Sequence, residues 1–113
     1  MLNANIGFRW IMEEENIILG HNDEMFYVKV GKRRVTRLLY KIEDNVMYLT
    51  SIYTLKEFRG RGLASKIVEY ALNYALEKGI KELKISCNYV KHWLQKHPNY
   101  AEKFRKIIYD QCT

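Results

Sequence analysis

A glycine-rich, basic stretch at residues 56–66, KEFRGRGLASK, carries the clearest chemical signal in the sequence. Gly60 and Gly62 alternate there with Arg59 and Arg61. If the stretch joins a strand to a helix, the unpaired N–H groups at the helix start attract anions, and glycine lets a phosphate approach the backbone. The pattern therefore predicts a site for a phosphate-bearing ligand, and a simple tight turn is the alternative.

Other ligand-binding patterns are missing from the sequence. The GxxxxGK[ST] motif is absent, and GRGLAS has Ser65 where the dinucleotide-binding fingerprint requires its third glycine. Cys87 and Cys112 stand alone, without a CxxC pair or a Cys/His cluster at ligand spacing, so we expect neither a metal site nor a disulfide. Unpaired thiols favour a reducing, cytoplasmic setting.

Length and composition indicate one compact domain. The chain has 113 residues, of which 48% are hydrophobic. No apolar run reaches the length of a signal peptide core or the roughly 18 residues of a membrane span, so we expect a protein of the cytoplasm with no membrane partner. The net charge of +6 suits a polyanionic ligand, although a solvated lysine-rich surface is the plainer reading.

Hydrophobic alternation predicts three strands, at residues 25–30, 34–43 and 46–55, joined by short turns into an antiparallel meander. From residue 63 the apolar spacing becomes helical and continues to a stop at Gly79. These elements place the glycine-rich stretch between the third strand and the helix.

Residues 80–87 then return as a strand, residues 89–97 indicate a short helix that ends near Pro98, and residues 100–110 indicate one more helix. The first 24 residues have no clear pattern, and residues 5–12, NIGFRWIM, suggest either an added strand or a loosely packed extension. The order is α+β, with a crossover helix that makes the third and fourth strands parallel.

The RGRGLA run at residues 59–64 matches the R/Q-x-x-G-x-G/A signature of the GNAT superfamily of acetyl-CoA-dependent N-acetyltransferases. Residues 57–100 resemble the short, minimal branch of that superfamily, which also has CNYV at residues 87–90 and KHPNY at residues 96–100. The likeness covers residues 25–104. It implies a single minimal GNAT-like domain over residues 25–113, preceded by an extension, residues 1–24, with a V-shaped splay between the parallel strands and helices at the C-terminal end.

The resemblance also implies a cofactor, acetyl-CoA. Backbone amides of Arg61 through Ser65 would hold the pyrophosphate, with Arg59 and Arg61 near the phosphates. The backbone of Tyr53 through Leu55 would run beside the pantetheine arm, and Asn88 begins a helix that flanks the cofactor thiol. The implied cofactor-binding residues are Tyr53, Thr54, Leu55, Arg59, Gly60, Arg61, Gly62, Leu63, Ala64, Ser65 and Asn88.

Two residues are candidates for catalysis. Cys87 corresponds to a cysteine near the thioester in this branch, and it is either the nucleophile of a covalent route or a small buried residue at a strand end. Tyr89 either donates a proton to the departing thiolate or simply packs. For direct attack by the amine, Tyr53, Glu57 and His92 are the candidate bases, because the third strand carries no carboxylate.

The sequence also departs from the family pattern. Ser51 and Leu55 stand where many members of the branch have histidine and proline. The two helices that larger GNAT enzymes place between their first two strands are missing, which favours an open groove and a protein or peptide amine as the acceptor. The hairpin at residues 31–37, GKRRVTR, carries either solvated charges or a site for an acidic substrate or the CoA 3′-phosphate.

Two other functions fit the same residues. One is a GNAT-fold module that binds acyl-CoA without turnover, which the lack of an evident base favours. The other, which we consider the least favoured, is a basic nucleic-acid-binding protein, suggested by the +6 charge and nine tyrosines. The oligomeric state, monomer or homodimer, is open at this stage.

Overall fold

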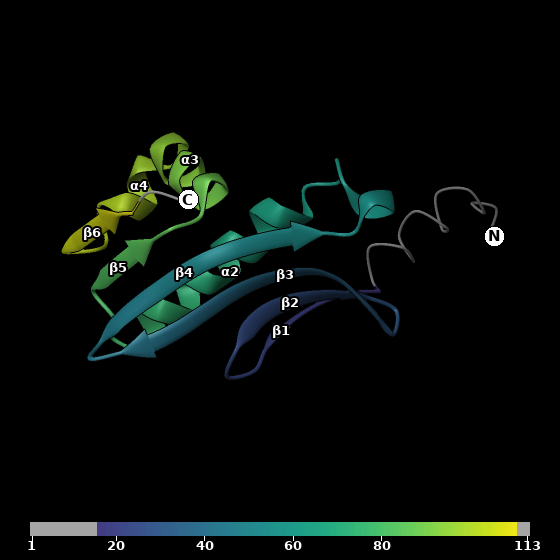
Figure 1. Ribbon diagram of the computed structural model, residues 1–113, viewed down its shortest axis with the longest axis horizontal. Coiled ribbons are helices and arrows are strands. Elements are labelled where there is room, and N and C mark those ends of the chain that lie inside the picture. The colour runs from purple at the N-terminus through teal and green to yellow at the C-terminus, as the bar shows by residue number, and fades with distance from the viewer. Residues whose placement is uncertain (1–15, 111–113) are drawn as a thin grey trace, which may run out of the picture.

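The computed structural model describes residues 16–110 (Figure 1). Six strands form one sheet: β1 (Ile17–His21), β2 (Met25–Val30), β3 (Arg33–Glu43), β4 (Val46–Thr54), β5 (Glu82–Ile85) and β6 (Lys106–Tyr109). Four helical segments accompany them: η1 (Lys56–Phe58), α2 (Leu63–Glu77), α3 (Asn88–Lys96) and α4 (Pro98–Ala101).

The strands lie in the sheet in the same order as in the sequence, from β1 to β6. Strands β1 to β4 are antiparallel, whereas β4, β5 and β6 run parallel to one another. Helix α2 provides the crossover from β4 to β5 (Figure 1). The predicted α+β fold, with an antiparallel meander followed by a helix and a parallel strand, is confirmed.

Local backbone chemistry explains the turns of the meander. Asp44 and Asn45 connect β3 to β4 with φ values of +53° and +64°, the left-handed region that these two residue types tolerate best. A two-residue loop with both φ values positive also matches the twist of the strands that it joins. Gly79, with a φ of +78°, ends α2 as the sequence predicts.

The core lies between one face of the sheet and α2. Strand residues that alternate along β2, β3 and β4 are fully buried against the apolar side of the helix. The main contributors are Phe26, Val28, Leu38, Met47 and Leu49 from the sheet and Ile67, Val68, Ala71, Leu72 and Ala75 from α2. Within residues 16–110, no helix covers the opposite face of β2, β3 and β4 (Figure 1).

The first and last strands, β1 and β6, are the two strands that the sequence pattern did not predict. The expected helix over residues 100–110 is wrong: α4 ends at Ala101, and Lys106–Tyr109 forms β6 beside β5. The run Ile107, Ile108 and Tyr109 has the β-branched and aromatic character of a strand, and β5 offers it an unpaired edge. Strand β1 comes from the stretch that the sequence left unplaced, and residues 5–12 lie outside the described residues.

An aromatic cluster joins β1 and β2 to α2. The His21 ring lies 4.4 Å from the Tyr74 ring, and its Nδ1 atom is 3.1 Å from the Tyr70 hydroxyl. Phe26 stacks on Tyr40 with ring centroids 4.2 Å apart, and the Tyr40 hydroxyl donates to the Asn22 carbonyl at 2.6 Å. No helix among the described residues is both long and apolar enough to cross a bilayer.

Tyr40 links this cluster to pH-dependent stability. Burial, followed by neighbouring Tyr74 and Asp23, raises the pKa of Tyr40 to about 12. An unfolded tyrosine titrates near pH 10, so the folded protein holds this proton more tightly. The stability that Tyr40 confers is therefore complete below about pH 10 and is lost as the pH rises through about 12.

We predict that Tyr40→Phe lowers the free energy of unfolding at pH 7 by about 1 kcal/mol, because the hydrogen bond to Asn22 is lost. It should also flatten the decline in stability between pH 10 and 12. Urea unfolding at several pH values measures both effects. Tyr48→Phe is the control, because Tyr48 contacts Lys41 and Lys84 and takes no part in the aromatic cluster. An unchanged slope in Tyr40→Phe would contradict the assignment.

Candidate active site at the parting of two strands

Strands β4 and β5 stay together over only part of their length. Val46 through Leu49 pair with Glu82 through Ile85, and the Ser86 N–H adds a final bond to the Leu49 carbonyl at 2.9 Å. Strand β4 then continues to Thr54, whereas the other chain turns into α3 at Asn88. The strands part in a V, and no strand within residues 16–110 pairs with the edge of β4 from Thr50 to Thr54 on that side.

A β-bulge decides which backbone groups face this open edge. Leu39 pairs with Ser51 but Tyr40 pairs with Leu49, so Thr50 is an extra residue on β4. The Leu55 N–H donates to the Val35 carbonyl at 2.8 Å, which fixes the alternation that follows the bulge.

By that alternation, the N–H groups of Tyr53 and Leu55 face β3, whereas those of Ile52 and Thr54 face the open edge. The backbone stretch Tyr53 to Leu55 therefore borders the splay, but Thr54 alone of the three directs its N–H there. Ile52 is a residue that the sequence analysis missed, because a register shift between two strands leaves no mark in hydrophobic alternation.

The glycine-rich turn brings the start of α2 to the same place. Gly60 and Gly62 have φ values of +79° and +78°, which favour glycine, and a Cβ built on either would meet nothing within 4 Å. No side chain of the described residues caps the helix, and Lys66 is the first residue whose N–H bonds back, to the Gly62 carbonyl at 3.1 Å. The N–H groups of the first turn, on Leu63, Ala64 and Ser65, are therefore available to an anion.

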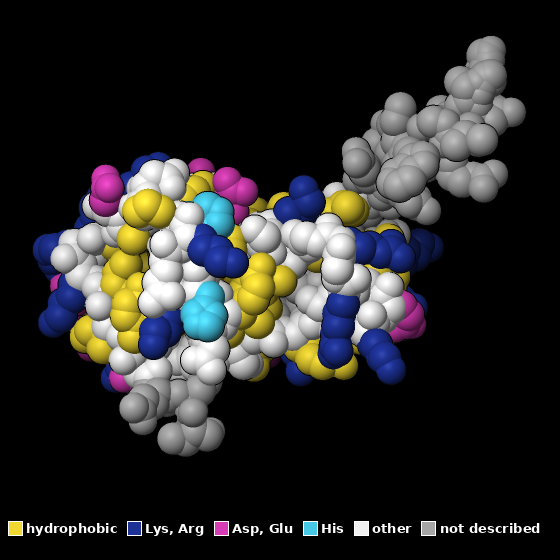
Figure 2. Space-filling view, turned by 90° about the horizontal axis from the view of Figure 1, so that it is seen from above, with side chains coloured by type: hydrophobic (Ala, Val, Ile, Leu, Met, Phe, Trp, Pro, Cys, Tyr) yellow, Lys and Arg dark blue, Asp and Glu magenta, His cyan; other side chains and the backbone are white. Residues whose placement is uncertain are grey.

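Arginines flank this turn. The Arg59 Nε donates to the Thr54 carbonyl at 2.9 Å, and its guanidinium lies 5.5 Å from the centre of the Tyr53 ring. The Arg61 guanidinium lies over the Phe58 ring at 4.9 Å. Figure 2 shows further Lys and Arg side chains at the end of the molecule that Figure 1 assigns to η1 and the β2–β3 hairpin. This end favours negatively charged ligands.

The start of α3 forms the other side of the splay. Cys87 occupies the position just before α3 without a side-chain capping bond and is only 6% exposed, whereas the following Asn88 and Tyr89 are exposed. The Trp93 Nε1 donates to the Ser65 hydroxyl at 2.8 Å and thereby holds α3 against the first turn of α2. The structure therefore brings the two candidate catalytic residues and the glycine-rich turn together.

Tyr89 is suited to hold a proton there. Desolvation raises the pKa of its hydroxyl above the usual value near 10, a hydrogen bond with Ser65 lowers it, and neighbouring Cys87 raises it further. The net shift is upward, so Tyr89 is fully protonated at neutral pH and can act as a hydrogen-bond donor.

The candidate bases are not brought together. Glu57 lies in η1 and forms an exposed ion pair with Arg33 at 3.3 Å. A backbone hydrogen bond and that arginine hold the pKa of Glu57 below its ordinary value, so it stays ionised at neutral pH. Tyr53 points from β4 toward Arg37, with 5.6 Å between ring and guanidinium, and His92 is exposed on α3.

Solved structures of low sequence identity share this fold. An IAA acetyltransferase from Bacillus cereus is 15% identical over 80% of this chain and 59% of its own, with a TM-score of 0.54. The ribosomal-protein-S18-alanine N-acetyltransferase from Escherichia coli is 9% identical over 74% of this chain and 61% of its own, with a TM-score of 0.51.

The aminoglycoside N-acetyltransferase AAC(6')-Iy, in complex with a bisubstrate analogue of CoA, is 16% identical over 96% of this chain and 79% of its own, with a TM-score of 0.51. At such identities these similarities show the fold alone. The chain spans about three fifths of the length of the first two enzymes. Curated proteins give no significant match.

Sequence similarity to a family is direct, however. The family model for GCN5-related N-acetyltransferases matches residues 25–103, well over half of the chain. That range runs from β2 to the loop after α4 and includes the bulged strand, the glycine-rich turn and the start of α3. The chain therefore belongs to the GCN5-related N-acetyltransferase family.

Proposed function

We propose that this protein transfers an acetyl group from acetyl-CoA to an amine of a protein or peptide. One observation carries the proposal: the open edge of β4 leads directly to the uncapped, glycine-rich start of α2. An extended, amide-containing arm that ends in phosphates needs this combination, a strand edge followed by an anion site.

The residues present fit acetyl-CoA. Amides of Arg61 through Ser65 would hold the pyrophosphate, with the side chains of Arg59 and Arg61 beside it and no Cβ at Gly60 or Gly62 to obstruct it. The backbone of Tyr53 through Leu55, with the outward N–H groups of Ile52 and Thr54, would lie along the pantetheine. Asn88 would flank the thiol end. When bound, acetyl-CoA supplies an activated acyl group as a thioester.

The chain itself contributes two hydrogen-bond donors on opposite sides of the splay. The Ile52 N–H faces the open edge just after the bulge and is suited to stabilise negative charge on a carbonyl oxygen. Tyr89, protonated at neutral pH, is suited to give a proton to a thiolate. The open edge admits water, which takes the proton from the amine, since β4 carries no carboxylate.

Cys87 lies beside these groups, and the proposal assigns transfer directly to the amine. Its low exposure of 6% supports this choice, because attack by a thiolate requires access to the acyl group. A second candidate function, acyl-CoA binding without turnover, is favoured by the lack of a carboxylate on β4.

Ligand binding is the first test. Acetyl-CoA or CoA at a hundred times its dissociation constant should stabilise the fold by about 2.7 kcal/mol and raise the melting temperature by roughly 10 °C. Differential scanning fluorimetry over a concentration series measures the shift, and AMP serves as the control ligand. No shift with either CoA ligand would refute the proposed function.

Intact mass separates the two chemical routes in the same samples. Direct transfer predicts no adduct on the protein after incubation with acetyl-CoA. An acetyl adduct that disappears in Cys87→Ala would instead establish a covalent route. Release of CoA in the presence of lysine-containing peptides separates an enzyme from a module that only binds.

The role of the Ile52 amide can be tested by removing it. Ile52→Pro deletes an N–H that faces the open edge and makes no bond within the sheet, so the protein should still fold. We predict a fall in kcat of about 100-fold, as for loss of one donor from an oxyanion site. Tyr53→Pro removes an N–H that faces β3 and should destabilise the sheet instead. Near-normal kcat in a folded Ile52→Pro protein would contradict the role.

The role of Tyr89 has a signature in the pH profile. Because its pKa is raised, we expect kcat to fall only above about pH 10, as the phenol ionises. Tyr89→Phe should lower kcat by about 100-fold near pH 8 and abolish this alkaline decline. The profile is measured with a lysine-containing peptide, and Tyr109→Phe is the matched control. An unaltered decline in Tyr89→Phe would assign it to another group.

A further inference from the structure

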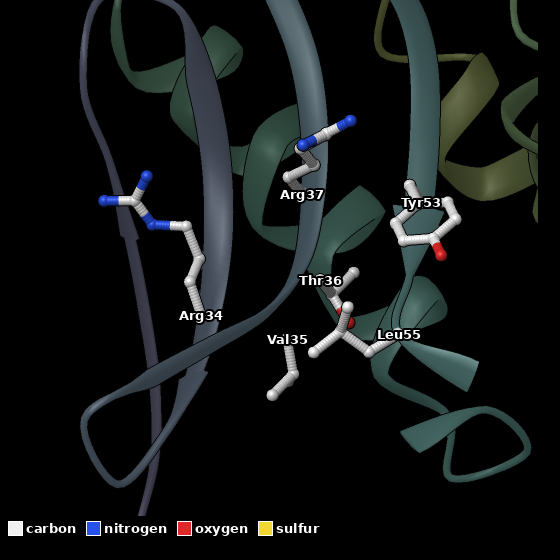
Figure 3. A pocket seen from close by; sticks show the side chains of 6 residues that line it. All are labelled: Arg34, Val35, Thr36, Arg37, Tyr53 and Leu55. Carbon is white, nitrogen blue, oxygen red and sulfur yellow. The ribbon is translucent and has the colours of Figure 1, made fainter. Parts of the chain in front are cut away.

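A small pocket opens on the helix-free face of the sheet, between β3 and β4. Its volume is about 90 Å³, and it is lined by Arg34, Val35, Thr36, Arg37, Tyr53 and Leu55 (Figure 3). The sequence hairpin GKRRVTR supplies four of these residues. The proposed function leaves this pocket without a role.

The pocket combines an apolar wall with a cationic rim. Val35 and Leu55 supply the wall, and the buried Thr36 donates its hydroxyl hydrogen to the Thr54 hydroxyl at 3.2 Å. Figure 3 shows Arg34 at one side and Tyr53 at the other, with Arg37 between them on the strand next to that of Tyr53. A short aliphatic stem that ends in an anion matches such a lining.

Neither rim arginine has a carboxylate partner among the described residues. Arg34 lies over the Tyr27 ring at 4.6 Å and contacts the Met25 sulfur at 3.6 Å, and Arg37 lies over the Tyr53 ring at 5.6 Å. By contrast, the neighbouring Arg33 is paired with Glu57. Both guanidinium groups lie over aromatic rings, and neither is neutralised by a carboxylate of the described residues. Each can therefore bind a carboxylate or phosphate of a ligand.

The size of the pocket limits what it admits. A bound water needs only about 10–15 Å³ of such a cavity, so the pocket has room for several waters but is far smaller than the several hundred Å³ of a typical small-molecule site. That volume accommodates the end of an aspartate or glutamate side chain but not a nucleotide. The charge and the volume together favour a carboxylate on a flexible chain.

The pocket also lies close to the splay. Arg37 pairs with Tyr53 across the two strands, and Tyr53 follows Ile52, whose N–H faces the open edge. Tyr53 is 47% exposed and stands between the pocket and Arg59 of the glycine-rich turn. A group bound in the pocket therefore contacts Tyr53, the residue next to Ile52 of the proposed reacting site.

We propose that the Arg34–Arg37 pocket binds an aspartate or glutamate side chain of the acceptor, so that the amine to be acetylated is presented by an acidic polypeptide segment. This proposal rests on the proposed function. It assigns the hairpin arginines to the acceptor and leaves the CoA phosphates to the glycine-rich turn.

The test uses NMR on the full-length ¹⁵N-labelled protein, saturated with CoA so that no transfer occurs. The probes are the capped peptide acetyl-Glu-Glu-Lys-Glu-Glu-amide and its counterpart with four glutamines. The acidic peptide should shift the Arg34 and Arg37 Nε–H and Tyr53 amide resonances saturably, with at least tenfold higher affinity than the glutamine peptide. Added salt should weaken this binding.

Variants identify the groups responsible. Arg34→Gln and Arg37→Gln should each weaken acidic-peptide binding by about tenfold without changing CoA affinity. The matched control is Arg105→Gln, because Arg105 is already paired with Glu82 and lies beside β6. The expected effect of this control on peptide binding is less than twofold.

Four outcomes would overturn the proposal. The pocket resonances could stay fixed at saturating acidic peptide while CoA still shifts the splay, which would leave the proposed function intact. Lower affinity of the Arg34 and Arg37 variants for CoA, but not for dephospho-CoA, would assign the pocket to the 3′-phosphate. Displacement of the peptide by oligouridylate with a steep salt dependence would assign it to nucleic acid. Failure of CoA itself to bind would refute the proposed function on which the pocket depends.

Discussion

The early separation of β4 from β5 is the constraint on which the site depends. Four residue pairs hold the strands together, and then α3 begins at Asn88, so β5 cannot continue beside β4. A strand edge without a partner usually invites aggregation or pairing with another chain. Here the starts of α2 and α3, joined by the bond from Trp93 to Ser65, flank the exposed edge.

The bulge at Thr50 affects the site because, within the described residues, β4 has no partner strand beyond it on the open side. Without the extra residue, the alternation would turn Ser51 and Tyr53 toward the open edge in place of Ile52 and Thr54. One inserted residue thus sets both the amide that faces the splay and the face on which the Tyr53 ring stands. The same shift places Tyr53 beside Arg37, so the splay and the Arg34–Arg37 pocket share a structural origin.

Sequence patterns predicted the elements whose residues carry a local signal. Alternation at residues 25–30 and the helical spacing from residue 63 follow from burial on one face. Gly60 and Gly62 indicate a turn, because the turn needs positive φ values that glycine adopts most easily. Pairing partners and register carry no such signal, which is why the role of Ile52 went unpredicted. The helix expected over residues 100–110 failed because helical and strand periods are hard to distinguish in so short a segment.

The order of the strands in the sheet affects how fast the chain can fold. Each strand pairs with its neighbour in sequence, and short turns join β1 to β4, so these four strands can pair without waiting for a distant segment. Contacts between nearby segments cost less loop-closure entropy and favour rapid folding. The outermost strands are also the first and last of the described chain, and neither carries the residues of the splay. Evolution can therefore lengthen, shorten or replace either end while β4, α2 and α3 keep their arrangement.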